Sequence, residues 1–284
     1  MLASALTFTL MTTLIKYLGE DFPAALQTFY RCAATFVVLL PAIIRDPRGA
    51  FRTTRPGILI FRSAVGVTAT IFAFYAYQKM PLADANALSF TRALWLVPLA
   101  VFVLGEKVGP RRIAATVVGF LGVLLMLQPR GDSAGLSLPA LAALASSLMF
   151  ATTITGMKVM TRDHSTTTLL VWAGVLGVIM SLPPALFVWR WPTGFELFLL
   201  STMGVLGAVT QACYIKGMSI GDAAAMAPVD YTRLIFAGLL GYVLFQDIPN
   251  LLTMVGATVV IGSTLYITFR EMKVGATKAP AEEP

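Results

Sequence analysis

The chain has 284 residues, of which 57% are hydrophobic and only 12% are charged, and its formal net charge is +7. A soluble domain carries about 25% charged residues, so this composition excludes an ordinary soluble protein and predicts an all-α integral membrane protein. The two cysteines, Cys32 and Cys213, lie inside apolar runs, which predicts packing residues and not a disulfide framework.

Ten apolar segments follow one another along the chain, each near the length of about 20 residues that a membrane-spanning helix needs. The first has no basic n-region and is interpreted as a helix, not as a cleaved leader. The ten predicted helices cover residues 2–18, 24–44, 57–79, 83–104, 113–127, 138–158, 167–189, 195–217, 222–245 and 250–269. Residues 273–284 are small and charged, which predicts a disordered cytoplasmic tail.

The second half of the chain resembles the first. Short motifs recur at nearly constant spacing: Asp84-Ala85 as Asp222-Ala223, Thr91-Arg92 as Thr232-Arg233, and the ATVV of 115–118 as that of 257–260. This spacing is close to half of the chain length. We therefore expect two five-helix repeats, 1–128 and 139–272, joined by a connector at 129–138.

Lys and Arg are distributed unevenly between the two sides of the predicted membrane. Fourteen of them lie at the termini and in the loops after the second, fourth, sixth and eighth helices, whereas four lie on the other side. Cytoplasmic loops retain Lys and Arg, so both termini are predicted to be cytoplasmic. Because each repeat has an odd number of helices, the repeats are predicted to be inverted. Inverted repeats can open a shared midplane site to each side in turn, as secondary transporters do, although some channels share this architecture.

Two short motifs connect this architecture to a known family. The turn before the predicted helix 83–104 reads MPLADA, at 80–85, and Gly105-Glu106-Lys107 follows that helix. Together with the ten helices, these motifs resemble the EamA-type exporters of the drug/metabolite transporter (DMT) superfamily over nearly the whole chain. The similarity is greatest to bacterial exporters of aromatic and neutral amino acids. In the second half Phe245-Gln246-Asp247 stands where Gly-Glu-Lys is expected, so the second copy of the motif is weak.

The resemblance implies a carrier of the bacterial inner membrane that exports a small metabolite from the cytoplasm by alternating access through a central cavity. An amino acid is the expected substrate. A multidrug or other metabolite exporter of the same fold and a channel-like pore are the alternatives. Uniport and proton antiport are both compatible with the sequence, and so is any oligomeric state.

Charged residues inside the predicted helices are the first signal of a binding site. Arg92 sits about nine residues into its helix, where a charge is costly unless it faces protein or water. It is interpreted either as a donor to a substrate carboxylate or to a cavity network, or as a structural residue that pairs with a helix-end carbonyl or extends to the membrane surface. Asp230 and Arg233 are three residues apart on one helix face and can pair with each other.

Aromatic and amide side chains form the second signal. Rings could stack on the apolar part of a substrate while amides fix its polar end, although lipid-facing or core positions would also suit these residues. We expect the site near the midplane, between the helices 57–79, 83–104, 195–217 and 222–245. The predicted substrate-binding residues are Phe74, Tyr75, Tyr77, Gln78, Arg92, Trp95, Gln211, Tyr214, Asp230 and Arg233.

Two prolines are candidates for gating. Pro98 and Pro228 each remove a backbone hydrogen bond inside a predicted helix, and both helices are therefore expected to bend. The bends would serve either gating or ordinary packing.

Enzyme chemistry is not expected. The sole histidine, His164, lies in a predicted loop, and neither a metal-ligand cluster nor a glycine-rich phosphate loop is visible. The sequence thus predicts no metal, no cofactor and no nucleic-acid partner. The expected partners are the lipid bilayer and a small molecule.

The charge distribution makes a direct prediction about topology. Cysteines introduced by Arg48→Cys and by Gly135→Cys should be labelled by a membrane-impermeant thiol reagent from opposite sides of the membrane. Labelling of both positions from the same side would contradict the inverted repeat.

Overall fold

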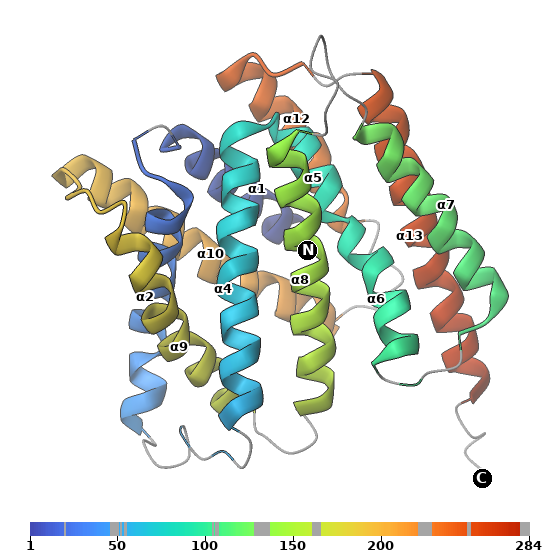
Figure 1. The fold of residues 1–284 in the computed structure, drawn as a ribbon, viewed down its shortest axis with the longest axis horizontal. Helices are drawn as coiled ribbons and strands as arrows, with labels where there is room; N and C mark the ends of the chain where they lie inside the picture. Colours follow the sequence, from blue (N-terminus) through green and yellow to red (C-terminus); the bar gives the residue numbers. More distant parts are fainter. Residues whose placement is uncertain are drawn as a thin grey trace.

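The computed structural model describes residues 1–19, 21–45, 51, 53, 56–103, 105, 108–127, 137–160, 166–220, 229–248 and 251–278. The regular structure of these residues is helical (Figure 1). The helices are α1 (Leu2–Tyr17), α2 (Ala24–Arg45), α4 (Pro56–Lys79), α5 (Leu82–Ser89), α6 (Thr91–Phe102), α7 (Pro110–Met126), α8 (Leu138–Met160), α9 (Thr166–Leu186), α10 (Gly194–Ile220), α12 (Thr232–Phe245) and α13 (Leu251–Lys278).

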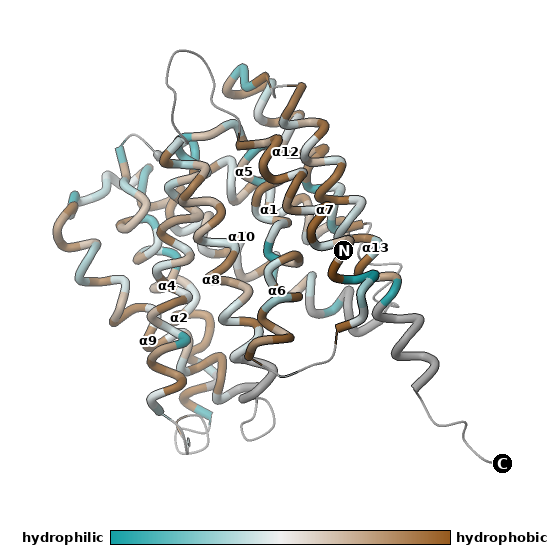
Figure 2. The backbone as a smooth tube through the Cα atoms, turned by 45° about the vertical axis from the view of Figure 1, so that its right-hand side comes forward, coloured by the Kyte–Doolittle hydropathy of each residue, from teal (hydrophilic) through white to brown (hydrophobic). Residues whose placement is uncertain are grey.

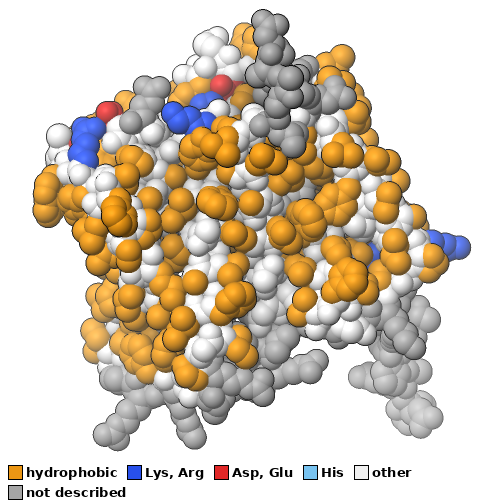
Figure 3. All heavy atoms as spheres, viewed as in Figure 1, with side chains coloured by type: hydrophobic (Ala, Val, Ile, Leu, Met, Phe, Trp, Pro, Cys, Tyr) orange, Lys and Arg blue, Asp and Glu red, His pale blue; other side chains and the backbone are white. Residues whose placement is uncertain are grey.

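The outer surface of the helices is apolar. Seven helical segments of the described chain are long and apolar enough to cross a membrane, and α1 and α12 are shorter apolar helices. Large hydrophobic side chains such as Leu124 and Ile235 are exposed. Hydrophobic residues recur along the whole length of the helices (Figure 2), and their side chains are spread over the face seen in Figure 3. Soluble monomers rarely expose apolar patches of this extent. The prediction of an all-α integral membrane protein is therefore confirmed.

The helix contacts have an internal symmetry. α1 packs against α10 and α4 against α8, while α2 packs against α9 and α7 against α13. In the predicted repeats α1 corresponds to α8, α4 to α10 and α6 to α12. The α4–α8 contact therefore has its counterpart in the α10–α1 contact, and the α6–α8 contact has its counterpart in the α12–α1 contact. In Figure 1, α4 runs upward, whereas α10 runs obliquely from the upper left toward the lower right. This packing is expected of two inverted five-helix repeats, whose exact boundaries stay a prediction.

The span predicted as one helix at 83–104 is broken in the middle. α5 ends at Ser89, Phe90 forms a turn, and α6 begins at Thr91. The hydroxyl of Thr91 donates to the carbonyl of Leu88 at 2.7 Å. Phe90 keeps right-handed helical dihedral angles, with φ −69° and ψ −19°, and its N–H donates to the carbonyl of Ala87 at 3.2 Å, so the chain makes one tighter turn here.

The second repeat breaks in the same way. Tyr231 forms a turn before α12, and the hydroxyl of Thr232 donates to the carbonyl of Val229 at 2.7 Å. Both breaks therefore lie at hydroxyl residues. α6 is one helix through Pro98, so the main interruption of this span is not at the proline. Pro228 lies outside the described residues, and its predicted role in gating is untested.

The last helix is longer than its apolar part. α13 extends to Lys278, whereas the hydropathy predicts an end at Phe269. Most residues of 270–278 are good helix formers, so the helix continues after its apolar character has ended. The predicted disordered tail, 273–284, thus begins inside this helix, and residues 279–284 lie outside the described part of the chain.

α7 and α13 cross with their backbones in contact. A Cβ atom added to Gly256 would lie 2.5 Å from the carbonyl oxygen of Gly122, and one added to Gly122 would lie 2.9 Å from that of Gly256. Small residues let membrane helices approach this closely. A Cβ atom added to Gly262, on the same helix, would meet nothing within 4 Å.

This difference predicts the effect of one methyl group at two positions of α13. Gly256→Ala should destabilise the protein by about 1–3 kcal/mol, because the opposing backbone cannot yield without moving the helix. Gly262→Ala is the matched control and should change stability by less than about 1 kcal/mol. Thermal unfolding in one detergent would measure both. Equal melting temperatures for the two variants would contradict the close crossing.

Candidate functional site

The two helix breaks meet inside the protein. The ring centroids of Phe90 and Tyr231 lie 4.4 Å apart, with an interplanar angle of 50°. Each break is also held by a hydroxyl pair. Thr91 and Ser147 of α8 share a hydrogen bond of 2.7 Å, and the hydroxyl of Tyr231 is hydrogen-bonded to that of Thr264 in α13. The interrupted spans are therefore fixed against each other and against their neighbours.

Arg233 lies buried beside this contact. Its guanidinium carbon is 4.2 Å from the centroid of the Phe90 ring and 5.0 Å from that of Phe8. Nη2 lies 3.4 Å from Oδ2 of Asp230, which confirms the predicted pairing of these two residues. This contact lacks hydrogen-bond geometry. Among the residues that the structure describes, neither Nε nor Nη2 of Arg233 has a hydrogen-bond partner.

The unpartnered nitrogens indicate what Arg233 can bind. A buried charged group without hydrogen bonds is costly, and the side chain is only 7% exposed. A guanidinium offers parallel N–H donors that match the two oxygens of a carboxylate. Arg233 is therefore well suited to bind an anionic group of a substrate.

Arg92 lies within electrostatic range of Arg233. Asp230, Tyr77 and Tyr214 lie within the same range of Arg92. Tyr77 is buried, and its ring meets that of Phe8 edge-on at 6.3 Å. Two arginines against one aspartate leave one excess positive charge, which favours an anion. We use the name central cluster for Phe8, Tyr77, Phe90, Arg92, Tyr214, Asp230, Tyr231 and Arg233.

The structure places the other predicted binding residues outside this cluster. The amide of Gln78 donates to the carbonyl of Phe22 at 3.1 Å, and Phe74 lies under the guanidinium of Arg31 at 5.7 Å. Trp95 packs edge-on against Phe120 of α7 at 4.7 Å. Tyr75 is half-buried at the edge of the hydrophobic core, and Gln211 is exposed. No contact described for these five residues connects them with the central cluster, and their part in binding stays a prediction.

Three aromatic members of the central cluster, Phe8, Phe90 and Tyr231, are absent from the predicted binding set. The repeated Thr-Arg pairs contain a signal for two of them, because each pair is preceded by an aromatic residue: Phe90 in the first repeat and Tyr231 in the second. Phe8 has no comparable signal. It reaches Arg233 only through the packing of α1 against α12.

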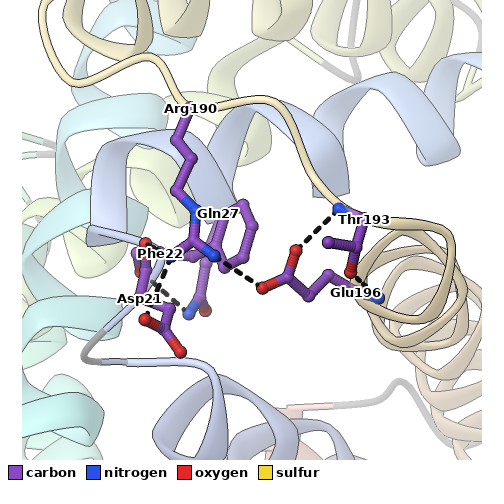
Figure 4. A network of polar contacts seen from close by, with 6 residues as sticks. All are labelled: Asp21, Phe22, Gln27, Arg190, Thr193 and Glu196. Atoms are coloured by element: carbon purple, nitrogen blue, oxygen red, sulfur yellow. Dashed lines mark hydrogen bonds and ion pairs between the residues drawn. The ribbon is translucent and has the colours of Figure 1, made fainter.

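A second polar network (Figure 4) lies at the end of the molecule at which α4 ends, the upper end in Figure 1. Arg190 joins Asp21, at 3.0 Å, to Glu196, at 2.9 Å. Glu196 accepts a hydrogen bond from the backbone N–H of Thr193 at 2.6 Å, and its own N–H donates to the Thr193 hydroxyl, which is the reciprocal bonding of a capping box. The network connects the α9–α10 linker to the segment between α1 and α2. Exposed ion pairs of this kind contribute little stability.

The described residues include no group of three or more His, Cys, Asp or Glu side chains arranged to hold a metal ion. Cys32 and Cys213 are free thiols, as their positions in apolar runs predict.

Comparisons with known proteins agree with this architecture. The model of the EamA-like transporter family matches residues 1–128 and 137–269. An S-adenosylmethionine uptake transporter of Rickettsia prowazekii is 30% identical over 98% of this chain and 94% of its own length. A riboflavin transporter of Rhizobium johnstonii is 30% identical over 96% of this chain and 91% of its own length. A crystal structure with 19% identity superposes with a TM-score of 0.61 over 96% of this chain and 98% of that chain, which indicates a shared fold.

Substitutions of Asp230 and Arg233 would separate what this pair contributes to stability from what it contributes to transport. Arg233→Met should cost about 2 kcal/mol of stability, because Asp230 loses its partner. The double variant Asp230→Asn/Arg233→Met should recover most of that loss and still fail to transport. Melting temperature and uptake into vesicles would measure the two effects. Wild-type transport by the double variant would show that the pair serves folding alone.

Proposed function

The chain belongs to the EamA-like transporter family, and on that premise we propose that it carries amino acids bearing a planar ring, with the central cluster as the binding site. The protein is a multi-pass membrane transporter and not an enzyme. The proposed substrate class includes aromatic amino acids and also larger metabolites in which an amino-acid group is attached to a heterocycle.

The observation that carries this proposal is the environment of Arg233. Its Nε and Nη2 atoms are buried and have no hydrogen-bond partner among the described residues. A substrate carboxylate would supply the missing acceptors, while Asp230 would attract the ammonium group. Because Phe90 and Tyr231 lie beside these charges, a planar ring on the same molecule could pack against them.

The relatives support the same chemical class. S-adenosylmethionine, named in the Rickettsia prowazekii transporter, is an amino acid that carries an adenine ring and a sulfonium cation. Aromatic side chains attract such cations. Riboflavin, named in the Rhizobium johnstonii transporter, has a planar ring and no carboxylate. The unpartnered Arg233 therefore favours a ring-bearing amino acid, such as S-adenosylmethionine or an aromatic amino acid, over riboflavin.

We further propose that the protein works in a bacterial inner membrane with both termini in the cytoplasm. The distribution of Lys and Arg supports this orientation. The two-fold packing of the helices suits alternating access, in which one site opens to each side in turn. In a carrier without coupling, the substrate gradient sets the direction of net movement. The same protein could then serve the export implied by the resemblance or the uptake named in the Rickettsia relative.

Counterflow in reconstituted vesicles would test the substrate class. Vesicles loaded with unlabelled S-adenosylmethionine, phenylalanine, tryptophan, alanine or riboflavin would be offered the same compound in radiolabelled form. We expect saturable counterflow for ring-bearing amino acids, strongest with S-adenosylmethionine, and little with alanine. Counterflow of riboflavin alone would contradict the role of Arg233 as a carboxylate ligand. Flux without counterflow or saturation would indicate a channel.

A pair of aromatic substitutions would locate the site. Phe90→Leu removes the ring beside Arg233 and Tyr231, and should weaken apparent affinity about five- to tenfold, for about 1 kcal/mol of ring contact. Trp95→Leu lies in the same span outside the central cluster and should leave the affinity within about twofold. A larger effect of Trp95→Leu than of Phe90→Leu would place the binding site nearer α7.

A further inference from the structure

A buried ion pair lies at the upper end of the molecule, apart from the central cluster. Lys16 stands in the last turn of α1, and Asp247 follows the end of α12. Nζ of Lys16 is paired with Oδ2 of Asp247 and also donates to the carbonyl of Met80 at 3.0 Å. The same Oδ2 accepts the backbone N–H of Leu82 at 3.2 Å. The pair thus joins α1, the α4–α5 turn and α12.

The backbone holds Asp247 in this position. Gln246 has a φ of 55°, in the left-handed region that residues other than glycine seldom adopt. This turn folds the chain back over α12, so that the N–H of Asp247 donates to the carbonyl of Gly241 at 3.0 Å. A conformation that costs about 1 kcal/mol persists here because the surrounding contacts require it. The carboxylate is therefore directed at Lys16 by its own backbone.

The pair is largely shielded from water. The side chains of Lys16 and Asp247 are 13% and 16% exposed, and Nζ of Lys16 lies 4.9 Å from the centroid of the Phe245 ring. The pair around Arg190 differs, because the side chains of Arg190 and Asp21 are 45% and 70% exposed. Interactions in the shielded environment are stronger and are screened less by salt. Of these two contacts, only the Lys16–Asp247 pair is suited to hold helices together.

The joined elements also carry the central cluster. Phe8 lies on α1 two turns before Lys16, and Arg233 lies on α12. Leu82 begins α5, which ends beside Phe90. Separation of Lys16 from Asp247 would release the upper ends of all three elements from one another. Because Ile15, Leu18 and Leu82 are buried there, the closed pair keeps this end packed above the cluster.

We propose that Lys16 and Asp247 form an outer gate, which is closed in this structure and which opens when the central cluster faces the predicted outer side. This inference rests on the proposed function as an alternating-access carrier. In this proposal Lys16 and Asp247 control access to the central cluster and do not bind the substrate.

Thiol accessibility would test the gate. Ala237 is fully buried on α12, one turn from Arg233 toward Gly241, and Ala237→Cys would serve as reporter in a protein that also carries Cys32→Ala and Cys213→Ala. A membrane-impermeant maleimide would be added to the predicted outer side of vesicles. Asp247→Asn and Lys16→Met should each speed labelling at least tenfold. The double variant should be no faster than the faster single variant, because the two substitutions remove one interaction.

Asp21→Asn is the matched control. It breaks the exposed contact with Arg190 at the same end and should leave labelling within about twofold. Unchanged labelling in both Asp247→Asn and Lys16→Met, with melting temperatures near wild type, would overturn the gate. Equal acceleration from both sides of the membrane would indicate local unfolding and would also overturn it. The assay uses no substrate, so an error in the proposed substrate class does not affect its outcome.

Discussion

The organisation of this protein depends on one constraint of the bilayer: a backbone N–H or carbonyl in hydrocarbon must find its partner within the protein. Unbroken helices meet this requirement by themselves, and they can therefore face lipid. Phe90 and Tyr231 keep right-handed helical dihedral angles, and their carbonyls accept hydrogen bonds from the N–H groups of Ala93 and Leu234, so the two spans tighten locally and keep these backbone bonds. The hydroxyls of Thr91 and Thr232 turn back to backbone carbonyls at these two points, and the rings of Phe90 and Tyr231 lie against each other.

Burial of the charged groups of the central cluster costs folding free energy. Arg92 and Arg233 lie near one another inside an apolar bundle, with Asp230 as their acidic neighbour. A packed hydrophobic contact would serve folding at least as well as such an arrangement. The rings of Phe8 and Phe90 offset part of the cost through cation–π contacts. In the proposed site, the remaining donors on Arg233 are those that a substrate anion would use.

The upper end contrasts with this arrangement, because the charged groups of Lys16 and Asp247 have hydrogen-bond partners there. Lys16, Asp247, the carbonyl of Met80 and the N–H of Leu82 bond to one another, and Gln78 holds the carbonyl of Phe22 nearby. Gln78 shows how a residue suited to binding can be committed to structure. Its amide could orient a substrate, yet the end of α4 brings it to the α1–α2 segment. The contrast between the unpartnered donors of Arg233 and the paired charges of Lys16 and Asp247 agrees with the proposed gate.

The sequence by itself determined the features that depend on local composition and spacing. Apolar length defined the spans, the recurrence of the Thr-Arg pair placed Arg92 and Arg233 in equivalent positions, and a separation of three residues predicted the Asp230–Arg233 pair. The tertiary structure alone decided which side chains of different helices meet. Phe8 reaches Arg233 while Trp95 turns to Phe120, because the rotation of each helix about its axis depends on its neighbours. Hydropathy does not specify that rotation in a helix that is apolar on every side.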